Sequence, residues 1–315
     1  MTTYLLKRLL AAVVVMWAVA TLVFFMLRAV PGDPLQAMLF DIGDPHAADV
    51  LRHKYGLDRP VYIQYGLWMW NIAHGDLGAS IYGSRVPVTQ IIAEALPRTM
   101  SLALLAFVIA MAIAVPAGII SAVRKNSPMD HGFTFLAFLG LSMPDFWLGI
   151  VLIIVFAVHL RWLPAIGYAP LSDGFIPWFR HLILPATAIG TAFSAILARM
   201  IRSSMLEVMK MDFITVARSK GLVEDRVVLK HAFRNALIPV ITVTGIAFAL
   251  LMAGAVVVEN VFAIKGLGRV LIQGILNRDY PVVQGAILVV SAIFVLTNLV
   301  VDVLYTVIDP RIRLR

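Results

Sequence analysis

Long stretches without a charged residue constrain this chain more than any other feature. Nineteen uncharged positions separate Arg8 from Arg28, and 25 separate Arg98 from Arg124. Three later stretches hold 18, 24 and 22 such positions. A transmembrane helix needs about 20 mostly apolar residues. Hydrophobic residues make up 61% of the 315 and charged residues 14%, against about 45–50% and about 25% in soluble domains, so a soluble globule is excluded.

These apolar runs predict an all-α integral membrane protein with six transmembrane helices. Their expected ranges are 9–29, 100–123, 133–160, 182–201, 239–258 and 282–306. The first range follows Lys7 and Arg8, as the core of a signal peptide would. Its apolar run exceeds the roughly 7–15 residues of such a core, so we interpret it as a retained anchor.

The formal net charge of +8 is mainly a topology signal. With a cytoplasmic N-terminus, the cytoplasmic segments carry 15 Lys and Arg residues and the external segments carry 11. Six of those 11 lie from Arg28 to Arg98, in a translocated region too long for the positive-inside rule. Trp162 and Trp178 bracket an external loop, as an aromatic interfacial belt would. We therefore predict that both termini are cytoplasmic, and we do not expect nucleic acid as a partner.

The sequence lacks the motifs of several kinds of chemistry. With no cysteine, disulfides, Fe–S clusters and thiolate metal sites are excluded. The dipeptide Gly-Lys does not occur, so no G-x-x-x-x-G-K-[ST] loop is present to hold nucleotide phosphates. The seven histidines are scattered without metal-ligand spacing. We expect no catalytic residue, no metal site and no cofactor bound by this chain.

Residues 31–97 form a long segment that we place outside the membrane. It combines turn signals, PGDP at 31–34 and HGDLG at 74–78, with an aromatic-rich helical stretch from Tyr62 to Trp70. Two interpretations stay open. The segment is either a cap on the outer ends of the helices or a docking surface for an external partner.

A cytoplasmic segment from Arg202 to Arg234 carries two amphipathic patterns. In the first, apolar residues recur at helical spacing before Gly221, a typical helix C-cap: Met209, Phe213, Val216 and Ala217. In the second, from about Glu224, one face carries Val228, Ala232 and Ala236. The pattern alone fits equally a helix that lies on lipid headgroups and a helix that docks on a partner.

Residues 212–240 resemble the EAA loop of permease subunits of bacterial ABC importers, most closely that of the dipeptide, oligopeptide and nickel group. They read DFITVARSKGLVEDRVVLKHAFRNALIPV. Ala217 and Gly221 fit the core pattern, whereas Thr215 and Val216 stand at the Glu and first Ala positions. Pro239 lies five residues later than in the general pattern, within HAFRNALIPV, a form that the peptide permeases show. Blocks over nearly the whole chain agree, among them AVPGDP, SMPDFW and GLGRVLIQGILNRDYPVVQG.

This resemblance implies a type I ABC importer permease fold with six transmembrane helices and a large external segment after the first. Residues 1–98 would hold the first helix and the external segment, and residues 99–315 a five-helix core with the EAA coupling loop at 202–238. The implied location is the bacterial inner membrane. The implied partners are a second permease in a heterodimer, two cytoplasmic ATPase subunits that bind ATP and Mg, and an extracytoplasmic peptide-binding protein. Residues 31–97 and the loop Asn260–Pro281 would receive that binding protein.

The resemblance also implies roles in the loop. Its short helix would sit in a groove of an ATPase subunit, with Phe213, Val216 and Ala217 filling the groove. Arg218 and Lys220 would form ion pairs at the rim, and Gly221 would permit the turn that follows. This chain would not be an enzyme, because hydrolysis belongs to the ATPases. The implied cargo is a dipeptide or short peptide, with nickel and glutathione as alternatives.

Asp145 is an acid well inside an apolar run, about twelve residues or 18 Å from the expected start of its span at 133. Such an acid costs about 2.5–3.5 kcal/mol on insertion scales, so it should face protein or water. The sequence Ser142-Met143-Pro144-Asp145 predicts a break near Leu141 and a restart with Ser142 as N-cap. Asp145 then either lines the translocation path with Ser142 or satisfies backbone N–H groups at the break.

Two other classes of function are weighed against the importer. A secondary transporter would show internal repeats and paired intramembrane charges. A membrane-bound enzyme would need a nucleophile with its base or a metal cluster. The sequence shows neither set of features, which favours the importer subunit.

Overall fold

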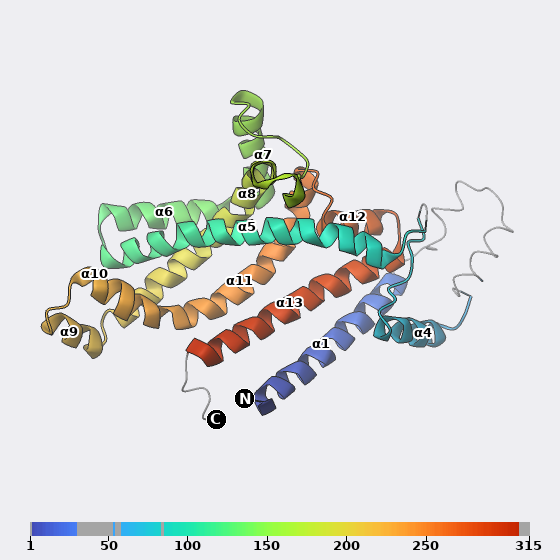
Figure 1. The fold of residues 1–315 in the computed structure, drawn as a ribbon, viewed down its shortest axis with the longest axis horizontal. Helices are drawn as coiled ribbons and strands as arrows, with labels where there is room; N and C mark the ends of the chain where they lie inside the picture. Colours follow the sequence, from blue (N-terminus) through green and yellow to red (C-terminus); the bar gives the residue numbers. More distant parts are fainter. Residues whose placement is uncertain (1, 30–52, 54–57, 83–84, 309–315) are drawn as a thin grey trace. The chain divides into compact units, whose positions relative to one another are not determined.

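Helices account for the regular structure of this protein, as a computed structural model describes it for residues 2–29, 53, 58–82 and 85–308. Within these residues strand pairing is limited to one isolated bridge, between Ala79 and Pro87. The longer helices are α1 Thr2–Ala29, α4 Val61–Ala73, α5 Val88–Val123, α6 Pro128–Ser142, α8 Phe175–Val208, α11 Arg234–Val261, α12 Leu267–Leu276 and α13 Tyr280–Ile308 (Figure 1). The shorter ones are α7 Asp145–Leu152, η1 Ile153–His159, η2 Leu171–Asp173, α9 Asp212–Ser219, α10 Glu224–Arg226 and η3 Val227–Phe233.

Within the described residues, four single helices are long and apolar enough to cross a membrane, and two bent helix pairs bring the number of such segments to six. Four are the single helices α1, α5, α8 and α13. Two are bent pairs, Pro128–Ser142 with Asp145–His159 and Glu224–Leu237 with Pro239–Phe248. The six expected ranges fall on these six segments, which confirms the predicted all-α membrane fold.

The chain forms two compact units, Met1–Pro97 with Lys265–Val295, and Arg98–Ile264 with Leu296–Arg315. The expected division into 1–98 and 99–315 follows family modules and stays a prediction. The turn signal at 31–34 lies outside the described residues.

In the first unit, α4 packs against the end of α1. The Phe24 ring lies 5.2 Å from the rings of both Tyr65 and Trp68. Arg28 donates hydrogen bonds of 2.8 and 3.2 Å to the Gln64 side chain. The aromatic stretch expected from the sequence is therefore a helix, and one of its faces covers the end of α1. This arrangement supports the cap interpretation for that part of the external segment.

The helix α5 begins twelve residues before the expected start at 100. Its first turns are held by an apolar cluster in which Val88, Ile92 and Ala95 pack with Leu267 of α12 and Val282 of α13. Because this packing is favourable, the helix extends beyond its membrane-length apolar run. The last ten residues of the segment expected outside the membrane, 88–97, are therefore part of the helix α5.

In the second unit, α8 is the most buried of the long helices and contacts α6, α7 and α11. Small residues bring α8 close to α5. A Cβ atom on Gly190 would lie 2.8 Å from the backbone oxygen of Ala106, and one on Gly118 would lie 2.7 Å from the Ile201 side chain. Packing through small residues is typical of membrane helices, where close backbone approach replaces the hydrophobic driving force.

Candidate functional site

The helix α9 is a short element between α8 and α11, and only a three-residue linker precedes it. It follows α8 after Met209, Lys210 and Met211, and these three backbone N–H groups donate to carbonyl groups of the last turn of α8. Asp212 stands in the first turn of α9, where its negative charge interacts favourably with the helix dipole. α9 and α10 lie together at one end of the second unit (Figure 1).

One face of α9 packs against its own chain and the other is exposed. Ile214 is fully buried and Ala217 is 8% exposed, whereas Phe213 is 40% and Val216 51% exposed. The expected grouping of Ala217 with Phe213 and Val216 on one outward stripe is wrong. Ala217 lies three residues after Ile214, on the same side of the helix. The outward apolar surface of α9 consists of Phe213 and Val216, continued by exposed Met211.

α9 ends in a Schellman motif, and Gly221 makes it possible. Gly221 has a φ of +73°. Its N–H donates to the Arg218 carbonyl at 2.9 Å, and the Leu222 N–H donates to the Ala217 carbonyl at 3.4 Å, which is the bond pattern of that motif. Glycine adopts this left-handed conformation without the cost that a Cβ atom imposes. The predicted C-cap role of Gly221 is confirmed in this geometry.

Arg218 forms an ion pair inside the loop. Its guanidinium donates to the Glu224 carboxylate at 2.6 and 3.1 Å, across the turn at Gly221. This pairing raises the pKa of the Arg218 guanidinium above its ordinary value. Lys220 is exposed beside it. Both partners of the ion pair are half exposed, and such surface pairs contribute about 0–1 kcal/mol, so Arg218 can exchange Glu224 for another anion at low cost.

The three residues that the sequence pattern placed on one face after the turn pack against the chain itself, and neither lipid nor a partner covers them. Val228, Ala232 and Ala236 are all buried. The backbone there is a π-helix, η3, which passes directly into α11 and also contacts α9. Single-turn π-helical insertions in α-helices frequently lie at functional sites. α9 is therefore connected through short, ordered segments to both α8 and α11.

The third span breaks where the sequence predicted, but Ser142 is not its N-cap. Ser142 is the last residue of α6, and its hydroxyl donates to the Phe138 carbonyl at 2.8 Å. Met143 is extended because a residue before proline avoids the helical region. Pro144 then occupies the N-cap position of α7 without a side-chain hydrogen bond, and the two helices meet at an angle of 100°.

Asp145 is the first residue of α7 and is partly buried at this corner. Its Oδ2 atom would lie 3.0 Å from a Cβ atom placed on Gly254 of α11. Among the described residues, no side chain or backbone N–H donates a hydrogen bond to the Asp145 carboxylate. The expectation that Asp145 accepts from backbone N–H groups at the break is therefore wrong with respect to the described residues. The expected depth of Asp145, about 18 Å from the start of its span, assumed one straight helix. It does not apply, because α6 starts at Pro128 and the chain turns at Pro144.

Three buried acids at helix ends were missed by the sequence reasoning. Asp130 accepts two hydrogen bonds from Arg202, at 2.7 and 2.8 Å, and a third from Ser121. Glu259 is fully buried and accepts from Thr99 at 2.6 Å. Asp279 accepts from Ser80 and from the Ile81 N–H. Apart from Ser121, which is nine residues from Asp130, these side-chain partners are 72 to 199 residues away in the chain, so no sequence spacing could reveal them.

Within the described part of the chain, His, Asp and Glu side chains form no group of three or more that could hold a metal ion. Asp130, Glu259 and Asp279 each accept hydrogen bonds from hydroxyl, guanidinium or backbone donors. The loop and the corner at Asp145 remain the two candidate functional features.

Two family models match the chain. Residues 114–314 match the model described as binding-protein-dependent transport system inner membrane component. Residues 1–103 match the model for the N-terminal part of such membrane components.

Relatives resemble the chain over almost its whole length. A protein of Brucella abortus (strain 2308) is 48% identical over 313 residues, which cover 99% of each chain. The oligopeptide transport system permease protein AppB of Bacillus subtilis (strain 168) is 40% identical over 99% of this chain and 100% of its own. The dipeptide transport system permease protein DppB of Escherichia coli (strain K12) is 40% identical over 99% of each.

A solved structure shares the fold. It is the inward-facing MetNI methionine ABC transporter, which aligns with a TM-score of 0.58 at 18% identity. The alignment covers 70% of this chain and 97% of the matched chain. At this identity the match establishes the fold alone.

Proposed function

The chain belongs to the family of binding-protein-dependent transport system inner membrane components, and we propose that it is the permease subunit through which an ATP-driven importer takes up short peptides. Relatives that are 40% identical over their full lengths are named for oligopeptide and dipeptide transport, which supports peptides as the cargo class. As a transport component of an ABC system the chain is a multi-pass membrane protein, and ATP hydrolysis belongs to separate ATPase subunits. In our proposal ATP and Mg are bound by those subunits alone.

The observation that carries this proposal is the two-sided nature of α9. Its inner face, Ile214 and Ala217, is buried in the chain, and its outer face exposes Phe213 and Val216. An exposed apolar face on a helix of eight residues, held at both ends by ordered turns, is suited to fill a groove on another protein. We propose that an ATPase subunit supplies this groove. Ala217 would then position α9 against its own chain, and it would not enter the groove.

The rim contacts of the proposed interface follow from charge. Arg218 and Lys220 lie beside the exposed apolar face, and Glu224 neutralises Arg218 in the free chain. An acidic group on the ATPase would compete with Glu224 for Arg218. Rim charges of this kind set orientation and association rate more than affinity.

Movement of α9 would be transmitted to the membrane spans because its connections are short. On one side three hydrogen-bonded residues join it to α8, and on the other the Schellman turn leads into η3 and α11. α7, which carries Asp145, contacts both α8 and α11. A displacement of α9 driven by the ATPases would therefore shift the helices around Asp145. The translocation path would then open in turn to the external side and to the cytoplasm.

The orientation of the chain is part of the proposal. α9 would lie in the cytoplasm with both termini, and the start of α8 would lie at the external surface. Trp162 and Phe175, both more than 60% exposed, support an interfacial position for that end, and the distribution of basic residues supports its external side.

We propose the partners on the same basis, that the chain is the permease subunit of an ATP-driven importer. A second permease would complete the path as a heterodimer, and two ATPases would bind below it. An extracytoplasmic peptide-binding protein would dock on the external side, where α4 exposes Tyr62 and Trp70 and where Asp279 fixes residues 80–82.

Reconstitution tests the proposal. The chain is placed in liposomes with the second permease and the ATPases of its own system, and uptake of a labelled dipeptide delivered by the binding protein is measured. We expect uptake only with ATP and both ATPases present. Uptake driven by a proton or sodium gradient without ATP would overturn the proposal.

A further inference from the structure

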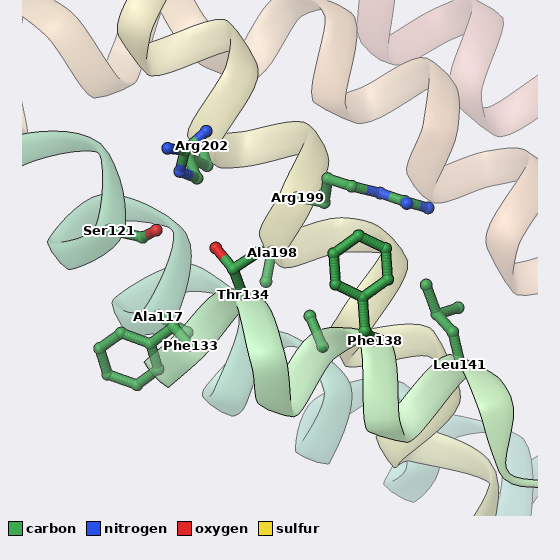
Figure 2. Close-up of a pocket in the computed structure, with 10 residues that line it drawn as sticks. Ala117, Ser121, Phe133, Thr134, Phe138, Leu141, Ala198, Arg199 and Arg202 are labelled. Carbon is green, nitrogen blue, oxygen red and sulfur yellow. The ribbon is translucent and has the colours of Figure 1, made fainter. Parts of the chain in front are cut away.

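Two connected hollows lie between α5, α6 and α8, and the larger reaches Met143 and Leu148 at the α6–α7 corner, although Asp145 does not line either one. The larger has a volume of about 420 Å³ and the smaller about 110 Å³. They share four wall residues: Ala117, Phe133, Ala137 and Ala198. Figure 2 shows the smaller hollow, with Phe133 and Phe138 on one side and Arg199 and Arg202 on the other. Together they form one groove, which we call the α5–α6–α8 groove.

The walls of this groove suit hydrocarbon. Most of the residues that line it are alanine, leucine, isoleucine, methionine and phenylalanine. The hydroxyls of Thr191 and Ser194 are already used, because they donate to the carbonyls of Thr187 and Thr191 at 2.7 Å. A peptide in this groove would leave its own N–H and C=O groups unpaired, at a cost of several kcal/mol each in an apolar setting. An alkyl chain has no such groups to satisfy.

Arg199 supplies a positive charge at the edge of the groove. Its side chain is exposed and extends beside Phe138 (Figure 2). Arg202, one turn further along α8, is neutralised by Asp130. For Arg199, in contrast, no acidic partner occurs among the residues that the structure describes. Arg124 and Lys125, in the turn between α5 and α6, add positive charge at the same end of these helices.

The outer side of α6 continues the apolar surface. Phe135, Leu136, Phe138 and Leu139 are each between 41% and 66% exposed. This surface lies within a candidate membrane span, so lipid is the solvent it meets. Basic side chains of this length extend along apolar surface and hold their charge at the headgroup level.

From these observations we propose that the α5–α6–α8 groove binds an anionic phospholipid of the leaflet on the α9 side. One acyl chain occupies the groove, and the phosphate contacts the Arg199 guanidinium. Charge complementarity selects an anionic lipid, because Arg199, Arg124 and Lys125 together attract net negative charge at the membrane surface. The groove volume lies in the range of about 300–1,000 Å³ that small-molecule sites occupy.

Native mass spectrometry of the assembled transporter tests this proposal. The complex is purified with phosphatidylglycerol or phosphatidylcholine, and the retained lipid is counted for the wild type and for two variants. Arg199→Gln removes the charge, and Ala137→Phe fills the groove. We expect selective retention of phosphatidylglycerol by the wild type and about fivefold less retention by Arg199→Gln, the effect of one basic group near an anionic surface. Ala137→Phe should also lose the lipid.

Two control variants make the comparison specific. Arg199→Lys keeps the charge and should retain phosphatidylglycerol. Arg161→Gln removes an exposed arginine just after η1, near the start of α8, and should leave retention unchanged. Equal retention by wild type, Arg199→Gln and Ala137→Phe would overturn the proposal, as would equal retention of the two lipids.

A second measurement distinguishes lipid from a protein occupant. The chain has no cysteine, so Ala137→Cys introduces a unique thiol in the groove. We expect this thiol to react with a lipid-soluble maleimide in the assembled transporter. If the thiol instead resists the maleimide, and a photoactivatable cross-linker attached at this position before assembly joins the second permease, the groove is a subunit interface and the lipid proposal is wrong.

Discussion

At the scale of single residues, Asp145 is the side chain that we propose to meet the cargo. A carboxylate at the corner of a broken span, facing Gly254 and without a described hydrogen-bond donor, can accept from a cationic group in the path. We predict that Asp145→Asn slows uptake of lysine-containing dipeptides by roughly tenfold, the equivalent of one charge-assisted hydrogen bond of about 1.5 kcal/mol. Uptake of neutral dipeptides should change less than about twofold by the same estimate. Uptake rates in proteoliposomes measure both.

The conservative variant Asp145→Glu should retain most of the preference for cationic peptides. An equal loss for cationic and neutral peptides in Asp145→Asn would mean that Asp145 acts on the fold of the corner and not on the cargo.

Asp130 and Arg202 support the fold in a different way. Asp130 is 2% exposed at its side chain, and its ion pair with Arg202 joins α8 to the first turn of α6. Arg202→Met leaves the buried carboxylate unpaired, so we predict a loss of about 3 kcal/mol in stability. Thermal unfolding in detergent measures it. Asp130→Asn combined with Arg202→Met should recover part of the loss, and no recovery would contradict the ion-pair explanation.

At the scale of elements, the turn after α9 allows a sharp test. Gly221 has open space around the position of a Cβ atom but a φ of +73°. Gly221→Ala should therefore cost about 1–2 kcal/mol through backbone conformation alone. Asparagine tolerates this conformation better, so Gly221→Asn should cost less. We expect the alanine variant to lower the peptide imported per ATP hydrolysed more than the asparagine variant does, and the reverse order would contradict the Schellman geometry.

The approach of α5 and α8 depends on small residues. A Cβ atom on Gly190 would meet backbone at 2.8 Å, which cannot move aside as a side chain can. We predict that Gly190→Val costs about 1–3 kcal/mol and lowers the yield of assembled transporter. Gly132→Ala is the matched control, because nothing lies within 4 Å of its Cβ position. Size-exclusion chromatography and thermal unfolding of both variants measure the difference.

The sequence predicted elements well where one physical constraint dominates. Apolar runs of membrane length fixed the six spans, and the restriction that Pro144 places on Met143 fixed the break in the third. The sequence also identified Gly221 as the end of α9. Each of these features depends on residues that are neighbours in the chain.

Features that depend on tertiary packing were not predictable in the same way. Helical spacing could not tell which side of α9 faces its own chain, so Ala217 was grouped with Phe213 and the buried Ile214 was left out. The early start of α5 depends on contacts with α12 and α13. The role of Arg202 depends on Asp130, 72 residues away.

At the scale of the whole molecule, the proposed function makes this chain one of two permease subunits of an ATP-driven importer. The chain has no nucleotide-binding motif, and its loop presents an apolar helix face to the outside. In the proposed importer, energy enters through contact between this face and an ATPase subunit. Loss of that contact should abolish transport while leaving the fold of the spans intact.

A double variant tests this separation. Phe213→Asp with Val216→Asp places charge on the outer face of α9, where Phe213 is 40% and Val216 51% exposed. We predict that the chain still assembles into membranes but loses at least tenfold in ATP-driven uptake, because buried charges weaken an apolar interface by several kcal/mol. Near-normal uptake by this variant would contradict the proposed role of the face.

Site-specific photocross-linking gives the most direct test of the central claim, that a separate ATPase holds the outer face of α9. A benzophenone amino acid replaces Val216 in the assembled transporter, and Ile176, exposed at the opposite end of α8, serves as the control position. The account predicts an adduct between position 216 and an ATPase subunit, and none from position 176. An adduct of position 216 with lipid alone would contradict it.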